Sequence, residues 1–345
     1  MVHCLVYVPT ISITNSITFA NVSDPKKDFP IIRAGGTIGW ILAAWPFTFI
    51  LVDWDSVQAA NPQGIIDWLG TVLKSGLTGE AMMEGTKWTY VAAGIASFIL
   101  AAFSLLLPHT PPKKVEEDSG DRLAWLGAVK LLKHPFILVL WLVTFADSFV
   151  HNCYFNWTGR FLGASVEDGG VGIPGNWIMP IMSLGQIAEI LTMLVLGMVL
   201  KKLGWRWTMV IGVLGHAARF AAYAFLPEHK ELIIGIQIVH GVCYAFFFAT
   251  VYIFVDEHFP KDARTSAQGL FNLMILGIGA LVANQACPYL FDNVYTKDSI
   301  TDFKSLFMFP LMCAVIAAFI LAIFFKPPDE GSNSEENQEA KAQET

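Results

Sequence analysis

Charged side chains are scarce in this sequence. Asp, Glu, Lys and Arg together make up 15% of the 345 residues, whereas a soluble globular domain carries about 25%. Hydrophobic residues account for 54%, and the mean hydropathy is +0.52. This scarcity excludes an ordinary soluble domain, and several apolar runs reach the roughly 20 residues that a bilayer-crossing helix needs. The sequence therefore predicts an all-α polytopic membrane protein surrounded by a lipid bilayer.

Signatures of soluble chemistry are also missing from the sequence. The five cysteines show neither C-x-x-C spacing nor the framework pattern of a disulfide scaffold. The motifs H-E-x-x-H and G-x-S-x-G and a Walker loop do not occur. We therefore expect no enzyme, no cofactor and no metal site, and any transport would be passive or driven by a gradient. An intramembrane enzyme using Asp147, His151 and Glu189, with or without a metal, is the less favoured alternative.

Apolar segments long enough to cross a bilayer follow one another along the chain. They are residues 31–53, 88–107, 135–155, 174–200, 206–226, 232–255, 267–290 and 304–325. An earlier stretch, residues 2–20, is rich in Thr, Ser and Asn, and its polar face suits contact with other helices better than contact with lipid. Lys and Arg gather in alternate connections, which predicts a multi-pass protein of the cytoplasmic membrane with its C-terminus in the cytoplasm.

A charged stretch divides the chain into two halves. We expect a partial N-terminal helical bundle over residues 1–107, a cytoplasmic linker with an amphipathic helix over 108–134, a C-terminal six-helix bundle over 135–326 and a disordered acidic tail over 327–345. At most three spans precede the linker, and six follow it. The sequence thus predicts about nine transmembrane helices and an N-terminally incomplete chain that lacks about three helices.

Two polar residues interrupt the apolar segment 180–200. Gln186 and Glu189 lie three residues apart, so they share one helix face near the middle of their span. A carboxylate at mid-bilayer depth is costly unless it is paired or faces water, which favours a role in binding a substrate or a proton. The alternative is a structural salt bridge from Glu189 to Arg219, which lies on the next helix beside His216.

Arginine and threonine share a helix face at the start of the segment 31–53. Arg33 and Thr37 are four residues apart, and Gly35, Gly36 and Gly39 between and beyond them would permit close helix contact. An arginine at this position could also reach the membrane surface with its long side chain. The spacing therefore leaves a ligand site and a tight helix pair both open.

Two histidines also stand at four-residue spacing from another polar residue. Asp147 and His151 form a titratable pair on one helix face, which predicts a proton-linked element unless the pair lies at the outer membrane surface. His240 and Tyr244 have the same spacing and precede three consecutive phenylalanines. Flat aromatic rings suit stacking against a ring-shaped ligand, although in membranes they more often serve packing.

Six stretches together resemble the nucleoside:proton symporter family of the major facilitator superfamily. They are YVPTISITNSITF with FPIIRAGGTIGWI, IMSLGQIAEILTM, LGHAARFAAYAF, HGVCYAFFFATVYIFVD and ARTSAQGLFNLMILGIGA, and they follow the family's order over nearly the whole chain. The resemblance implies helices four to twelve of a twelve-helix carrier with a nucleoside site between its two halves. It implies these substrate-binding residues: Arg33, Thr37, Trp40, Asn152, Gln186, Glu189 and Tyr244.

One position departs from the family's pattern. Family members often carry an aspartate directly after the position that matches Tyr244, and this chain has Ala245 there. If that carboxylate takes part in proton coupling or sugar binding, its absence leaves open either the coupling or the identity of the substrate. The hypothesis is that another group replaces it here. Glu189, Asp147 and His151 are the candidates.

The resulting hypothesis is a secondary active transporter that imports nucleosides, with proton symport, by alternating access. Its partners are nucleosides, protons and the lipid bilayer, and we expect neither a nucleic acid polymer nor an obligatory protein partner. The alternatives are a transporter of another polar ring compound, such as a sugar, and a truncated membrane protein that does not transport.

Overall fold

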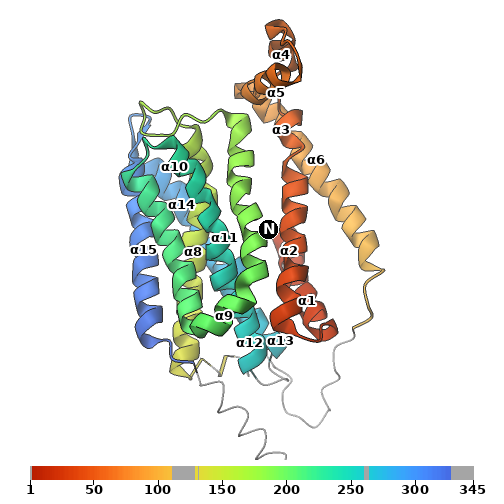
Figure 1. Ribbon diagram of the computed structural model, residues 1–345, viewed down its shortest axis with the longest axis vertical. Helices are drawn as coiled ribbons and strands as arrows, with labels where there is room; N and C mark the ends of the chain where they lie inside the picture. Colours follow the sequence, from red (N-terminus) through yellow and green to blue (C-terminus); the bar gives the residue numbers. More distant parts are fainter. Residues whose placement is uncertain (1, 111–128, 131, 260–263, 328–345) are drawn as a thin grey trace, which may run out of the picture.

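The computed structural model describes residues 2–110, 129–130, 132–259 and 264–327 (Figure 1). The predicted linker helix and acidic tail lie largely outside these residues. The first half contains α1 (Val2–Asn21), α2 (Pro25–Ala44), α3 (Phe47–Ile50), α4 (Trp54–Ala60), α5 (Ile65–Lys74) and α6 (Gly79–Ser104). The regular elements of the described part are helices, apart from one hairpin of two two-residue strands and an isolated bridge between Val52 and Gly76, which confirms the predicted all-α class.

The second half is a bundle of longer helical segments. Its elements are α8 (Pro135–Gly163), α9 (Gly175–Phe225), α10 (Lys230–Gly235), η1 (Ile236–Ile238), α11 (Val239–Cys243), η2 (Tyr244–Ala249), α12 (Thr250–His258), α13 (Arg264–Asn272), η3 (Leu273–Ile278), α14 (Gly279–Tyr289), η4 (Leu290–Tyr295), β1 (Thr296–Lys297), β2 (Ile300–Thr301) and α15 (Phe303–Phe324). Several of these run on without a break, so that Lys230–His258 and Ser266–Tyr295 each form one span.

Six helical segments of the described residues are long and apolar enough to cross a membrane. They are Glu80–Ser104, Pro135–Gly163, Trp177–Phe225, Lys230–His258, Ser266–Tyr295 and Phe303–Phe324. The segment Trp177–Phe225 joins two predicted spans, because α9 reverses direction at Gly204, whose φ of 67° suits glycine (Figure 1). The helix expected over 31–53 differs: α2 begins earlier, at Pro25, and ends before Pro46, after which the short α3 follows.

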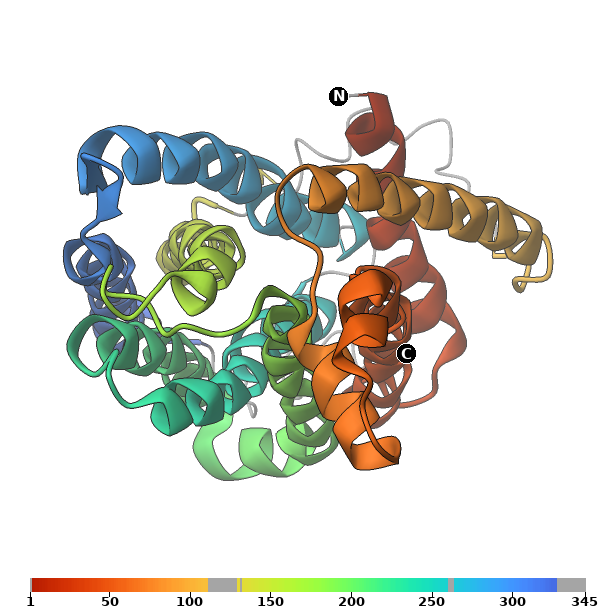
Figure 2. The same cartoon turned by 90° about the horizontal axis from the view of Figure 1, so that it is seen from above.

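The core of the second half forms around α8. Seen from above, α8 lies inside a ring of α9, α10–α12, α14 and α15 (Figure 2), and it packs directly against α9, α14 and α15. Aromatic rings fill the contact: Phe161 lies 5.1 Å from Tyr223 and 5.0 Å from Phe307, measured between ring centroids. Trp157 is also buried and donates a hydrogen bond from Nε1 to the Cys287 carbonyl, at 3.1 Å. This interior holds the second half together as one body.

The first half meets the second mainly through α2. This helix packs along the first arm of α9, whereas α6 leans away from the bundle (Figure 1). The apolar part of α6 is exposed along its whole length, as expected of a helix surface in contact with lipid or other apolar groups. The interface of α2 with α9 and η2, which we call the seam, is therefore where the two halves touch near buried polar residues.

Two glycines let α9 and α11 approach each other closely. A Cβ added at Gly241 would lie 2.4 Å from the backbone of Ala188 and Glu189, and one added at Gly185 would lie 2.8 Å from the Cβ of His240. Contacts of this kind between small residues are the usual way in which membrane helices pack tightly. The position of Glu189 relative to η2 thus depends on the absence of a side chain at residue 241.

We expect Gly241→Ala to lower the thermal stability of the detergent-purified protein. Overpacking of a close contact costs about 1–3 kcal/mol, and here the added carbon would meet backbone atoms that cannot rotate away. Gly235→Ala is the matched control, because a Cβ at that helical position meets nothing within 4 Å. Equal melting temperatures for the two variants would contradict the close contact.

Candidate functional site

Two hydrogen bonds join α2 to Glu189 of α9 and to Tyr244 of η2 across the seam. Thr37 Oγ1 on α2 donates to Glu189 Oε1 on α9, at 2.7 Å, and Arg33 Nη2 on α2 donates to the Tyr244 hydroxyl at the start of η2. Both donors come from one face of α2, because they lie four residues apart. Thr37 and Glu189 are each only 4% exposed. Four residues that the family resemblance implied are thus brought together by the tertiary structure.

The charges at the seam offset one another. The Arg33 guanidinium lies 5.0 Å from the centroid of the Tyr244 ring, and it is near enough to Glu189 for an electrostatic attraction. An unpaired charge at this depth would be strongly unfavourable, so a cation and a carboxylate on opposite sides of the seam stabilise each other. The arrangement offers both a cationic donor and an anionic acceptor to a polar ligand.

Three further implied residues have different surroundings. Gln186 is 5% exposed, and its Oε1 has no hydrogen-bond partner within the described residues. Trp40 lies on the next turn of α2 after Thr37 and is half-buried. Asn152 on α8 is also half-buried, and its amide donates to the carbonyl of Ser148 in the same helix, at 2.8 Å. Gln186 therefore provides a free acceptor, while the Asn152 amide is already bonded.

The glycines of α2 do not have the role that their sequence suggests. A Cβ at Gly35 or Gly39 would meet nothing within 4 Å, so neither residue lies at a close helix contact of the described structure. A Cβ at Gly36 would meet Nη1 of Arg33 at 2.8 Å. Gly36 thus leaves room for the arginine side chain, and the tight backbone contact is made by Gly185 and Gly241 instead.

Arg219 donates hydrogen bonds to two histidines. It is completely buried, with Nη1 at 3.0 Å from His240 Nδ1 and Nη2 at 2.8 Å from His216 Nδ1. Its guanidinium carbon also lies 3.8 Å from the centroid of the Tyr154 ring. The sequence left open a salt bridge between Arg219 and Glu189; the hydrogen bonds of Arg219 instead remain inside the second half, and Glu189 bonds across the seam.

Asp147 and His151 also face α9 and α11. The Asp147 carboxylate is completely buried, and its Oδ2 lies 3.7 Å from Nε2 of His216. The His151 ring stacks on His240 with 5.1 Å between centroids. The helix spacing correctly put Asp147 and His151 on one face, but the contacts that define them come from other helices, which sequence spacing cannot reveal.

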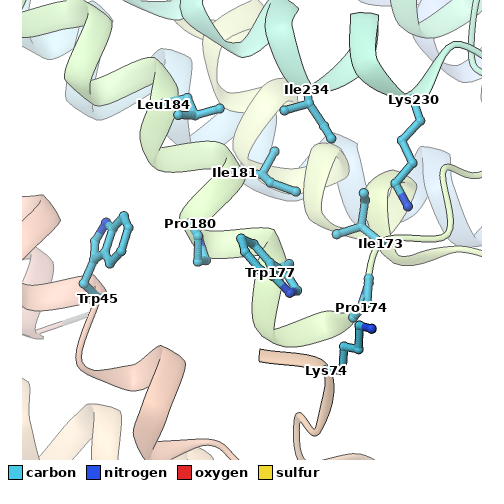
Figure 3. A pocket seen from close by; sticks show the side chains of 10 residues that line it. All are labelled: Trp45, Lys74, Ile173, Pro174, Trp177, Pro180, Ile181, Leu184, Lys230 and Ile234. Atoms are coloured by element: carbon cyan, nitrogen blue, oxygen red, sulfur yellow. The ribbon is translucent and has the colours of Figure 1, made fainter. Parts of the chain in front are cut away.

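A cavity of about 490 Å³ lies toward the N-terminal end of α9 from the seam (Figure 3). Trp45, at the end of α2, faces Pro180 of α9 across it, and Leu184 is another of the residues that line it. Trp45 Nε1 also donates to Ser183 Oγ, at 3.2 Å. Trp45 and Ser183 were not predicted from the sequence, and nothing in their spacing distinguishes them from packing residues.

Helices long and apolar enough to span a membrane, with buried charged and polar side chains between them, are typical of a polytopic membrane protein. A family model described as nucleoside H+ symporter matches residues 1–73 and 62–330 of this chain. The chain belongs to this family of the major facilitator superfamily, as its motifs implied. It is accordingly a multi-pass membrane protein of a transporter family and not an enzyme.

Known proteins of this kind are similar over nearly the whole chain. YegT of Escherichia coli (strain K12) is 29% identical over 95% of this chain and 72% of its own length. Xanthosine permease of the same organism is 26% identical over 94% of this chain and 72% of its own length. A crystal structure of a mutant of the nucleoside transporter NupG superposes with a TM-score of 0.64 and 25% identity, covering 92% of this chain and 74% of that one.

We expect Thr37→Val to lower the thermal stability of the purified protein, because it leaves Oε1 of the buried Glu189 without its donor. An unsatisfied buried acceptor costs about 1–3 kcal/mol. Thr37→Ser is the control, since it keeps the hydroxyl that donates across the seam. If the valine and serine variants melt at the same temperature, the bond does not contribute to closing the seam.

Proposed function

We propose that this chain imports nucleosides together with protons, by alternating access, and that the seam is its nucleoside site. The observation that carries the proposal is the pair of cross-seam hydrogen bonds, Thr37 to Glu189 and Arg33 to Tyr244. Family membership supports the class of substrate. The names of the relatives, a xanthosine permease and a nucleoside transporter, agree with it.

The chemistry of the seam suits a nucleoside. The hydroxyls of a ribose need strong acceptors, and the Glu189 carboxylate supplies one once Thr37 moves away. A base presents donors and acceptors at its edge, and Gln186 has an acceptor oxygen without a partner. The half-buried Trp40 and Tyr244 rings offer flat faces against which a base can stack. Asn152 would contribute from α8 if its amide leaves the Ser148 carbonyl.

The same hydrogen bonds between the two halves are consistent with alternating access. The contacts between α2 and α9 hold the two halves together, and a nucleoside that takes over Glu189 and Arg33 removes that restraint. The halves can then rock about the bound substrate, as in other carriers built from helical repeats. On this proposal the protein lies in the cytoplasmic membrane with its C-terminus in the cytoplasm, and the two halves correspond to residues 1–107 and 135–326.

We expect Glu189→Gln to weaken uridine binding by the purified protein about 10- to 100-fold, because hydrogen bonds to a charged group contribute about 1.5–3 kcal/mol. Isothermal titration calorimetry measures the affinity, and a melting curve verifies folding. Asp292→Asn is the control: it removes a carboxylate that is 60% exposed and is bonded to the exposed Arg160.

Two results would contradict the proposed substrate site. One is unchanged uridine affinity in a folded Glu189→Gln protein. The other is displacement of the bound ligand by a sugar such as glucose but not by nucleosides, which would indicate a carrier of another polar ring compound. A protein that loses its fold on Glu189→Gln would point to a structural role for the carboxylate.

A further inference from the structure

Five titratable side chains, four of them buried and His151 half-buried, form a cluster beside the seam. They come from three helices and are Asp147 and His151 on α8, His216 and Arg219 on α9, and His240 on α11. We call this group the α8–α9–α11 cluster. Asp147, His216 and Arg219 are 0% exposed and His240 is 1% exposed. The nucleoside site as described does not use these residues, so their burial calls for a separate explanation.

Arg219 fixes the tautomers of two histidines. A guanidinium can only donate, and it points Nη1 at Nδ1 of His240 and Nη2 at Nδ1 of His216. Both Nδ1 atoms must therefore accept, which places the proton of each neutral ring on Nε2. A second proton on either ring would displace the bond to Arg219. The arginine thus holds His216 neutral, with its Nε2–H available to the Asp147 carboxylate 3.7 Å away.

The Asp147 carboxylate can bind either His216 or a proton. Neither of its carboxylate oxygens has a hydrogen-bond partner in the described structure, and 3.7 Å is too long for a bond to His216. A bare carboxylate at this depth is unstable, so it must either close on His216 or take up a proton. In the first state its charge balances Arg219 through the imidazole. In the second state Asp147 is neutral and the cluster carries one additional positive charge.

Other groups around the pair are few and identifiable. From α11, Cys243 lies within electrostatic reach of Asp147. Tyr154 of α8 lies against Arg219, and Tyr244 lies 6.1 Å from His151. On the opposite side of α8, Gly279 of α14 packs against Ser148, whose hydroxyl donates to the Ile275 carbonyl, at 2.6 Å. Within the described residues, Asp147 is thus the carboxylate of this cluster.

The cluster is connected to the seam by ring contacts. His151 stacks on His240 and also lies 6.1 Å from Tyr244, measured between ring centroids. Tyr244 in turn accepts the hydrogen bond from Arg33 of the first half. His240 is held against Gly185, the residue before Gln186. A nucleoside that displaces Arg33 or Tyr244 therefore disturbs the packing around the cluster, and a change in the charge of the cluster is felt at the seam.

We propose that Asp147 and His216 form a proton-binding pair, separate from the nucleoside site, whose proton is taken up together with the nucleoside. The inference rests on the proposed function and names the groups that carry its proton. No bond other than that of the transferred proton changes: the proton comes from solvent, neutralises Asp147 and returns to solvent when the pair reforms. Because this site does not include residue 245, it can act in a chain that has alanine there.

The test is the number of protons bound with uridine, measured by calorimetry in buffers of different ionisation enthalpy. We expect the wild-type protein to take up about one proton, and its affinity to fall by up to about tenfold per pH unit as the pH rises. Asp147→Asn and His216→Asn should each abolish the uptake and make the affinity independent of pH. Asparagine at 216 keeps an acceptor for Arg219, and asparagine at 147 imitates the protonated carboxyl.

The control and the ligand-free measurement separate this inference from the proposed function. Asp292→Asn, which removes an exposed carboxylate, should keep the wild-type proton uptake. Proton uptake that persists in folded Asp147→Asn and His216→Asn proteins would contradict the proposed pair. Uridine binding by the wild-type protein without any linked proton would also contradict the pair, but it would leave the proposed nucleoside function intact. If uridine does not bind at all, the proposed function fails, and the coupling to nucleoside fails with it.

Infrared titration of the ligand-free protein then still decides whether the pair binds a proton. Carboxyl and imidazole signals that change with pH in the wild-type protein and are missing from both variants would support the pair. Spectra of the variants that equal the wild-type spectra would contradict the pair.

Discussion

The close approach of α9 to α11 determines the geometry of everything around the seam. Because Gly241 has no side chain, the backbone of α11 lies against the backbone of Ala188 and Glu189. The same contact sets the distance from Glu189 on one helix to Tyr244, one turn beyond Gly241, on the other. It also presses His240 against Gly185, within reach of Arg219. A wider spacing of these two helices would alter both the seam and the α8–α9–α11 cluster.

Buried charge is the second constraint, and the protein meets it locally on each side of this contact. Arg33 is stabilised by Tyr244 and by its attraction to Glu189, and Arg219 by two histidines with Asp147 beyond one of them. In lipid, such groups cannot turn to bulk water, so each hydrogen bond that opens must be replaced by another. On the proposed function, a polar substrate provides these replacements at the seam, so that a closed interface also serves as a binding site.

Much of the architecture was accessible from hydropathy alone. The apolar runs from residue 88 onward correspond to helices of the described structure, including the pair that α9 joins at Gly204. The helix over 31–53 was less accurately predicted, because Pro46 interrupts it and its first turns carry lysines and an aspartate. Glycine positions show the limit most clearly. Gly35 and Gly241 look alike in the sequence, yet only Gly241 faces a neighbouring backbone.

The sequence by itself determined the class of protein, the order of its helices and which polar residues share a face, because length, hydropathy and a spacing of three or four residues are local properties. Tertiary structure decided the partners. The fold brings Thr37 within hydrogen-bond distance of Glu189, which is 152 residues away in the sequence. It also places Arg219 where its guanidinium donates to His216 and His240 and not to Glu189. The physical reason is that helical spacing fixes the face on which a side chain lies but not the rotation of one helix against another. That rotation depends on packing between helices, such as the close contact of α9 with α11 at Gly185 and Gly241.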